Sequence, residues 1–313
     1  MLRRTLLLGL AAGLGLSGRY ATAADAAPGA SAVMASTKTS PLLPRPVTPA
    51  IPAPAVLPAP VSAVGRLDLA FTRNGRSLPT RVWYPVGPGP YPVIVFSHGL
   101  LSQPDDYAAL LIGWALAGFV VAAPLYPHTS FGTGSYNIYD IVNQPADASA
   151  VLTQVLATEE LTGRVDPTRL VAAGHSAGGI TTTGLFSDRR DDRLKAGVVL
   201  AGTDFLGAEF TGPAAPLMFV QGELDTTVAW SAARTVFEAV PWSRAMLTLP
   251  AGGHVTTAAE YRTITPATVA FLRWSLYGAE AGLVTAAAVG GIATLDDQRS
   301  AARTPAMSSG STS

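Results

Sequence analysis

One serine between an apolar strand-like run and a helix-like run constrains the fold more than any other feature of this chain. The run 169–173 has the apolar character of a buried strand, and the run 179–186 can start as a helix packed close to it. Gly174-His175-Ser176-Ala177-Gly178 joins the two runs. Its two glycines lack the Cβ atoms that would clash as the chain reverses. We therefore expect Ser176 to occupy a strained turn with its hydroxyl exposed.

The first residues have the pattern of a secretory signal. Residues 1–26 begin with paired arginines, continue with an apolar run from Leu6 to Leu16 and end in small residues. The run is shorter than the ~20 residues of a spanning helix, so no stable membrane span is expected after processing. The arginine pair leaves the general secretory and twin-arginine routes both open. An uncleaved N-terminal membrane anchor is the alternative.

Composition divides the rest of the chain into three segments. Residues 27–64 are rich in proline and alanine and predict an extended or disordered spacer. Residues 65–278 have the size of one α/β domain. Residues 279–313 are rich in alanine, glycine, serine and threonine, and we expect them to form a disordered tail.

Charge and cysteine content exclude several classes of function. The formal net charge is zero and charged residues make up 13% of the chain, so no basic stripe is available to bind nucleic acid. The chain has no cysteine, which excludes thiolate catalysis and thiolate-bound metals. We expect no metal and no cofactor.

Alternating strands and helices predict a doubly wound, mainly parallel α/β sheet. An antiparallel hairpin should open the domain, because alternating apolar residues flank the turn signal Asn74-Gly75. The last helix is expected to start at Pro266, capped by Thr265, and to end at Gly278. Further strands are expected at 92–97, 119–123, 196–201, 217–220 and 245–249, and further helices at 107–114, 145–158 and 229–240. The segment 202–213 is too short for a cap domain.

Several motifs in this order resemble the α/β-hydrolase superfamily. The resemblance is to its cutinase-like and polyester-hydrolysing members and to its dienelactone-hydrolase and chlorophyllase-type members, and it covers residues 80–278. It implies the α/β-hydrolase fold, with Ser176 at the nucleophile elbow between strand and helix. The motifs are Val93–Gly99, Gly118–Val121, Asp166–Gly179, Gly222–Asp225 and Gly252–His254.

The general base follows from the order of the triad in this superfamily, in which the serine comes first and the histidine last. His98 and His128 precede the serine, and His175 is its direct neighbour, which should point away along the turn. His254 follows the last strand and is flanked by small residues. We therefore expect His254 to accept the proton of Ser176.

The orienting acid should lie in the loop after the strand 217–220. Asp225 is the expected residue, because the loop would bring it under His254. Glu223 in the same loop and Asp204 after the preceding strand remain alternatives.

Backbone amides and loop side chains should complete the site. We expect the N–H groups of Leu100 and Ala177 to form the oxyanion hole. His98 should brace the turn before Leu100. Leu100, Phe205 and Tyr136 are expected to line an open cleft, and the loop 126–144 either walls that cleft or is a surface loop without a role.

Two departures from the polyester-hydrolysing enzymes concern substrate choice. Those enzymes carry an aromatic residue where this chain has Leu100, and a tryptophan where it has Gly202-Thr203-Asp204. Their C-terminal disulfide is impossible here because the chain has no cysteine.

The sequence thus predicts a serine esterase that acts through an acyl-enzyme on a small-molecule or polymeric ester. We expect a monomer that is secreted, periplasmic or bound to the cell envelope. A cutinase-like polyester hydrolase and a non-catalytic envelope binding module with a hydrolase fold are the alternatives.

Overall fold

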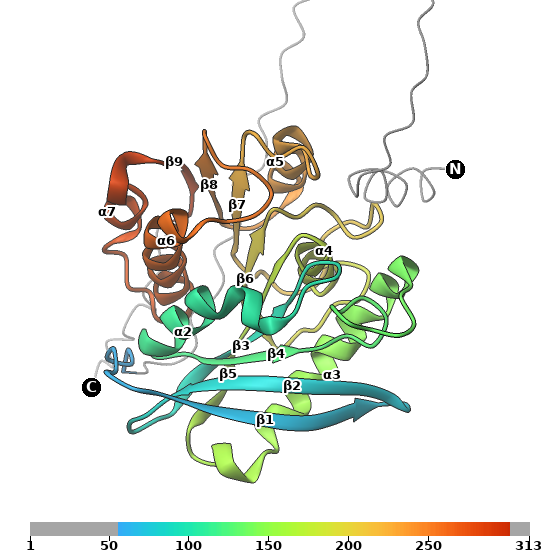
Figure 1. Ribbon diagram of the computed structural model, residues 1–313. Helices are drawn as coiled ribbons and strands as arrows, with labels where there is room; N and C mark the ends of the chain where they lie inside the picture. Colours follow the sequence, from blue (N-terminus) through green and yellow to red (C-terminus); the bar gives the residue numbers. More distant parts are fainter. Residues whose placement is uncertain (1–55, 301–313) are drawn as a thin grey trace, which may run out of the picture.

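A nine-stranded sheet runs through the protein, and helices cover both of its faces (Figure 1). The computed structural model describes residues 56–300. The expected signal peptide, residues 27–55 of the expected spacer and residues 301–313 of the expected tail lie outside the described residues.

The strand order is β1-β2-β4-β3-β5-β6-β7-β8-β9. Neighbours from β4 to β8 pair in parallel, whereas β1, β2 and β9 join their neighbours antiparallel. The expected mainly parallel α/β fold with an N-terminal hairpin is confirmed. The strands are β1 (Val64–Arg73), β2 (Arg76–Pro85), β3 (Tyr91–Ser97), β4 (Val120–Pro124), β5 (Val165–His175), β6 (Leu194–Leu200), β7 (Leu217–Gly222), β8 (Arg244–Leu249) and β9 (Thr294–Gln298).

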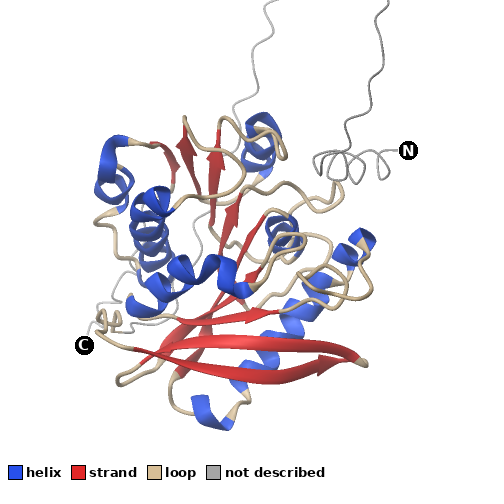
Figure 2. Ribbon diagram, viewed as in Figure 1, coloured by secondary structure: helices blue, strands red, loops and turns tan. Residues whose placement is uncertain are grey.

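Helices flank the sheet on both sides (Figure 2), and two clusters of buried apolar side chains hold them against it. On one face α2 and α6 pack around Trp114 and Phe271, and the indole N–H of Trp114 donates to Thr268 Oγ1 at 2.9 Å. On the other face α5 packs against β7 and β8 around Phe219 and Phe237, and α3 packs against β3 and β4 through Ala148 and Val151. The helices are α2 (Ala108–Leu116), α3 (Gln144–Leu156), α4 (Ala177–Gly184), α5 (Trp230–Ala239), α6 (Ala258–Tyr277) and α7 (Leu283–Ala287). Short 3-10 helices lie at Pro104–Tyr107, Ile138–Val142, Glu159–Leu161 and Val289–Gly291.

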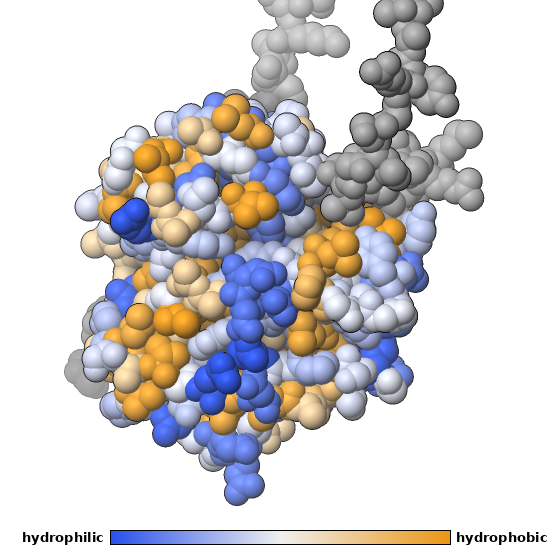
Figure 3. Space-filling view, in the orientation of Figure 1, coloured by the Kyte–Doolittle hydropathy of each residue, from blue (hydrophilic) through white to orange (hydrophobic). Residues whose placement is uncertain are grey.

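The hairpin β1–β2 turns where the sequence predicts. Asn74 and Gly75 both have positive φ, 49° and 77°, as a tight turn that follows strand twist requires. On the exposed side of the hairpin, Arg81 pairs with Asp68 and with Asp105, which precedes α2. Figure 3 shows a hydrophilic stripe that crosses the hairpin on this side.

Both predicted limits of the folded domain are wrong. Part of the expected spacer is attached to the domain, because the Val61 N–H donates to Leu116 O at 2.8 Å and Ala63 O accepts from the Val86 N–H at 2.9 Å. At the other end, residues 279–300 form α7 and β9, and Leu295 of β9 pairs with Leu247 of β8. The sequence of β9 has no apolar alternation that would predict a strand. The strand forms because it pairs with β8.

The predicted start of the last helix is also wrong. α6 begins eight residues before Pro266, after Thr257. Thr257 and Glu260 form a capping box, in which Thr257 N–H donates to Glu260 Oε2 at 2.6 Å and Glu260 N–H donates to Thr257 Oγ1 at 3.3 Å. Pro266 lies inside the helix, so its position mimicked a helix start. The helix ends at Gly278 as predicted, with φ at 70°.

Within the described residues, the connection from β6 to β7 contains no helix and therefore no cap domain. Among residues 56–300 no helix is both long and apolar enough to span a bilayer.

Candidate active site

The turn at Ser176 has the strained geometry that its two glycines allow. Ser176 lies between β5 and α4 with φ at 57° and ψ at −118°. A Cβ atom added to Gly174 would lie 2.1 Å from Gly178 O, and one added to Gly178 would lie 1.9 Å from Ser97 O. A backbone conformation of this kind costs about 1–3 kcal/mol and persists only where surrounding packing enforces it. Here strand β3 and helix α4 approach so closely that no side chain fits between them.

The structure brings Ser176, His254 and Asp225 together at the carboxyl ends of β5, β8 and β7. The Ser176 hydroxyl lies 2.9 Å from His254 Nε2, and His254 Nδ1 lies 2.8 Å from Asp225 Oδ2. The Asp225 carboxylate is fully buried, while 18% of the His254 side chain is exposed. A hydroxyl bonded to an imidazole that a buried carboxylate orients is an arrangement that can activate a serine.

The Asp225 carboxylate is held in its ionised form. Its Oδ2 also accepts from Gln221 Nε2 at 2.9 Å, and its Oδ1 accepts from the N–H groups of Thr227 and Val228, both at 2.8 Å. Burial alone would raise the pKa of Asp225, but the bonds from His254 and from these amides outweigh burial and lower it. Asp225 can therefore serve as a fixed negative partner for the imidazole.

Neither alternative acid contacts His254. The Asp204 carboxylate turns back on its own loop, where it accepts from the N–H of Gly207 and lies 3.2 Å from Thr203 Oγ1. Glu223 is exposed. The geometry therefore favours Asp225 over both.

His175, which we expect to point away from Ser176, also contacts the loop that carries His254. Its Nε2–H donates to the backbone carbonyl of His254 at 2.8 Å, and the two rings lie 5.0 Å apart. Its Nδ1 lies 3.0 Å from the Tyr107 hydroxyl, which in turn accepts from the Gly99 N–H at 3.1 Å. This chain of contacts joins the turn before Leu100 to the loop that carries His254.

Burial keeps His175 neutral. It lowers the pKa of His175 to about 4, and the hydrogen bond to the His254 carbonyl only partly offsets this effect. A neutral His175 places no second positive charge beside the imidazole of His254.

The other two histidines lie apart from the serine. His98 is buried, its Nδ1–H donates to Gly99 O at 2.7 Å, and its Nε2 accepts from Tyr126 N–H at 3.3 Å. His98 thus braces the turn, as expected. His128 bonds Ser135 within its own loop.

The two amides expected to form the oxyanion hole lie on the two sides of the serine's surroundings, one next to it in the chain and the other brought close by the fold. Ala177 follows Ser176 directly, and Leu100 follows Gly99, whose added Cβ would lie 3.3 Å from Ser176 Cβ. Within residues 56–300 no hydrogen bond uses the N–H of Leu100 or of Ala177. Two free donors next to a nucleophile suit a developing oxyanion.

A small apolar cluster adjoins the serine. Its buried members are Ile141, Ala177, Ile180 and Phe205, and its partly buried members are Leu100, Ile138, Val142 and Leu206. Because Ala177 follows Ser176 directly and Leu100 follows Gly99, the partly buried members of this cluster are apolar side chains close to the nucleophile.

Phe205 and Tyr136, which are both expected in the cleft, differ strongly in exposure. Phe205 is 2% exposed and packs within the cluster, so its place in the cleft stays a prediction. Tyr136 is 44% exposed, and no hydrogen bond or ring contact in the described chain joins it to Ser176, Asp225 or His254. Its place in the cleft stays a prediction.

The loop 126–144 contacts the site through that cluster. It contributes Ile138, Ile141 and Val142, and the buried amide of Gln144 at its end donates to Thr129 Oγ1 at 2.7 Å. The Gln144 Oε1 accepts from Thr181 Oγ1 of α4 at 2.6 Å. The sequence leaves two hypotheses for this loop. These contacts favour the hypothesis that it walls the cleft over the hypothesis that it is a surface loop without a role.

Gln221, Tyr107 and His175 support the site without having been predicted to do so: Gln221 bonds Asp225, and Tyr107 and His175 link the turn at Gly99 to the carbonyl of His254. Gln221 is a buried polar residue at the end of an apolar strand, and this signal could have suggested a partner for Asp225. Nothing local marks Tyr107, because its partners are 8 and 68 residues away along the chain. No group of three or more acidic or histidine side chains in the described residues could hold a metal ion.

Comparison with known families agrees with the fold. Residues 63–207 match the family model described as chlorophyllase, a segment that contains Ser176 and ends before Asp225. No curated protein matches the chain. The family match indicates a hydrolase that acts on esters. The chain has the α/β-hydrolase fold, and over residues 63–207 it is similar to the chlorophyllases of the α/β-hydrolase superfamily.

Proposed function

We propose that the protein is a serine esterase that cleaves carboxylic esters through an acyl-enzyme on Ser176. The observation that carries this proposal is the unbroken hydrogen-bonded chain from Ser176 Oγ through His254 to Asp225, with distances of 2.9 and 2.8 Å. The family match supports ester chemistry independently of that geometry.

Acylation uses three groups in turn. Ser176 Oγ attacks the ester carbonyl carbon while His254 Nε2 takes the hydroxyl proton, and Asp225 stabilises the imidazolium that forms. The amides of Leu100 and Ala177 donate to the carbonyl oxygen as it becomes negative. His254 then gives the proton to the departing alkoxide oxygen, which leaves as the alcohol.

Deacylation repeats these steps with water. His254 Nε2 removes a proton from a water molecule, whose oxygen attacks the acyl carbon and forms a second tetrahedral intermediate. When that intermediate collapses, the acid departs and Ser176 Oγ recovers its proton from His254.

The test combines labelling with two variants. We expect a fluorophosphonate probe to label the wild-type protein at Ser176, because only an activated serine reacts. Ser176→Ala and His254→Ala should each lower kcat for p-nitrophenyl butyrate by about 10³-fold or more, while circular dichroism shows a folded domain. His128→Ala is the matched control and should keep wild-type turnover, since His128 bonds only within its loop.

Two outcomes would contradict the proposal. Near-parental turnover in either active-site variant would exclude this triad. A folded wild-type protein that neither reacts with the probe nor hydrolyses any ester would favour the non-catalytic binding module.

We also propose that the enzyme meets its ester outside the cytoplasm. Support comes from the paired arginines, apolar run and small residues of positions 1–26. N-terminal sequencing of the protein recovered from the extracytoplasmic fraction would test this. An N-terminus at Met1 in the cytoplasmic fraction would contradict it.

A further inference from the structure

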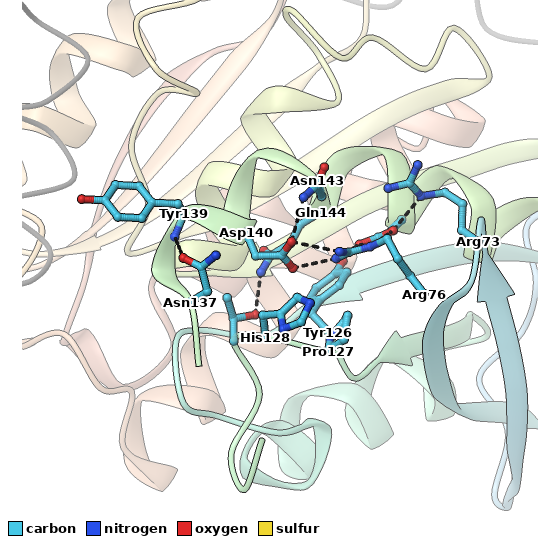
Figure 4. A network of polar contacts seen from close by, with 12 residues as sticks. Arg73, Arg76, Tyr126, Pro127, His128, Asn137, Tyr139, Asp140, Asn143 and Gln144 are labelled. Atoms are coloured by element: carbon cyan, nitrogen blue, oxygen red, sulfur yellow. Dashed lines mark hydrogen bonds and ion pairs between the residues drawn. The ribbon is translucent and has the colours of Figure 1, made fainter. Parts of the chain in front are cut away.

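The helix Ile138–Val142 contributes both to the apolar cluster beside the nucleophile and to a buried ionic cluster. Figure 4 shows the ionic cluster, with Asp140 opposite Arg76. Ile141 packs toward Ala177, whereas its neighbour Asp140 faces the tip of the β1–β2 hairpin. There the Asp140 carboxylate accepts two bonds from Arg76, from Nη1 at 2.9 Å and from Nη2 at 2.6 Å. Consecutive residues of one short helix thus contact the candidate substrate surface and the hairpin.

Arg76 uses its whole guanidinium group in this cluster. Its Nε and Nη2 also donate to Asp147 at the start of α3, at 3.1 and 2.7 Å. Arg73 donates to the same carboxylate at 2.6 Å, so two arginines balance two aspartates. Asp140 is 4% exposed and Asp147 is fully buried. Burial opposes the charge on Arg76, but the bonds to both aspartates outweigh it and raise the pKa of Arg76.

The two arginines are not equivalent. Among residues 56–300 the side chain of Arg73 bonds only Asp147, which belongs to α3, and it is 23% exposed. Arg76 alone of the pair contacts Asp140, whose remaining side-chain partner is Asn143 at 2.7 Å. Loss of Arg76 would leave the Asp140 carboxylate buried without a cation, so the segment 138–142 would have to move to rehydrate it.

We propose that Arg76 is a positioning residue that fixes the wall 138–142 and thereby sets the preference of the enzyme for acyl-chain length. The proposal rests on the esterase function proposed above. Ile138 and Val142 are the partly buried members of the cluster that this wall supplies, so they are the surface a longer acyl chain would contact. An acetyl group is too short to use the wall, whereas each methylene buried there should add about fourfold in affinity.

The experiment measures kcat and KM for p-nitrophenyl acetate and p-nitrophenyl hexanoate. In Arg76→Gln we expect KM for the hexanoate to rise at least fivefold with kcat kept, because lost apolar contact is lost uniform binding. Both constants for the acetate should stay within about threefold of wild type. The matched control Arg73→Gln should leave the hexanoate-to-acetate ratio of kcat/KM unchanged.

Two further variants test the proposal even if Arg76→Gln does not fold. Asp140→Asn removes the partner charge from the wall and should shift the ratio in the same direction. Arg76→Lys keeps the charge without the paired geometry and should give an intermediate ratio. Amide hydrogen exchange at 138–142 should accelerate in Asp140→Asn and Arg76→Gln, but not in Arg73→Gln.

Distinct results separate this inference from the esterase proposal. An unchanged ratio in the folded variants, or equal losses on both esters, would overturn the role of Arg76 while leaving esterase activity in place. Absence of hydrolysis of both esters by the wild-type protein would overturn the esterase function and this inference together.

Discussion

At the scale of single residues, His254 is held at two separate points. Asp225 bonds its ring through Nδ1, and His175 bonds its backbone carbonyl. The first contact sets the tautomer of the imidazole, and the second sets the position of the loop that carries it. Two independent restraints explain how a histidine in a glycine-rich loop keeps hydrogen-bond distance to Ser176.

Asp225→Asn should therefore be far more damaging than changes at the two other acids. An asparagine amide at this site can donate to Nδ1 and stabilise the wrong tautomer, a loss that can approach ~10⁴-fold in kcat. Asp204→Asn and Glu223→Gln should stay within about tenfold, because neither side chain contacts His254. Steady-state kinetics on p-nitrophenyl butyrate would decide, and a crippled Asp204→Asn beside an active Asp225→Asn would reverse the assignment.

Among the elements, the close contact of β3, β5 and α4 places the serine. A side chain at Gly178 would meet backbone atoms of Ser97, which cannot move aside as the end of a flexible side chain could. We expect Gly178→Ala to lower the free energy of unfolding by about 3 kcal/mol or more, measured by urea denaturation.

Gly134→Ala is the matched control for that experiment. Gly134 has open space around the position of an added Cβ and no positive φ, so its change should stay within about 0.5 kcal/mol. Equal stability of the two variants would show that the approach of β3 and α4 is looser than described.

Local signals predicted the elements well where each element carries its own pattern. The hairpin turn at Asn74-Gly75 and the helix end at Gly278 each depend on one or two residues that tolerate positive φ. The start of α6 was misplaced because Thr265-Pro266 imitates a cap, while the true capping box lies eight residues earlier. Strand β9 escaped prediction because an edge strand of polar residues depends on a distant partner.

The same distinction holds for the site. Motif and order along the chain predict Ser176 and His254, because both are properties of the sequence. Order leaves three candidates for the acid, and only the contact of Asp225 with His254 favours one of them. The contacts of His175 and Arg76 cannot be inferred in this way. The partners of His175 lie 68 and 79 residues away along the chain, and those of Arg76 lie 64 and 71 residues away. Only the folded chain shows which of several histidines and arginines support the site.

At the scale of the whole molecule, two buried neutral histidines make stability depend on pH. Burial lowers the pKa values of His98 and His175 to about 4, against 6.5 in the unfolded chain. Between these values the unfolded chain binds more protons, so the free energy of unfolding falls as the pH falls from about 6.5 to 4. Asp225 has a lowered pKa and loses its contribution only below this window.

We expect the loss between pH 7 and pH 4.5 to be roughly 5 kcal/mol if the two histidines act independently. Urea denaturation at the two pH values would measure it. His98→Asn should reduce the pH-dependent loss of unfolding free energy by about half, whereas His128→Asn should leave this loss unchanged. A free energy of unfolding that is flat over this range would contradict the role assigned to burial.

The two margins of the sheet have a consequence for self-association. An open edge invites strand addition by another copy, and many proteins prevent it with charge. β1 carries Arg66 and Asp68 along one margin, and β9 carries Asp296 and Asp297 along the other. Asp296 is bound in turn by Arg234 from α5. A second copy that docked margin to margin would have to strip water from these charges, which should keep the enzyme dispersed even in concentrated solution.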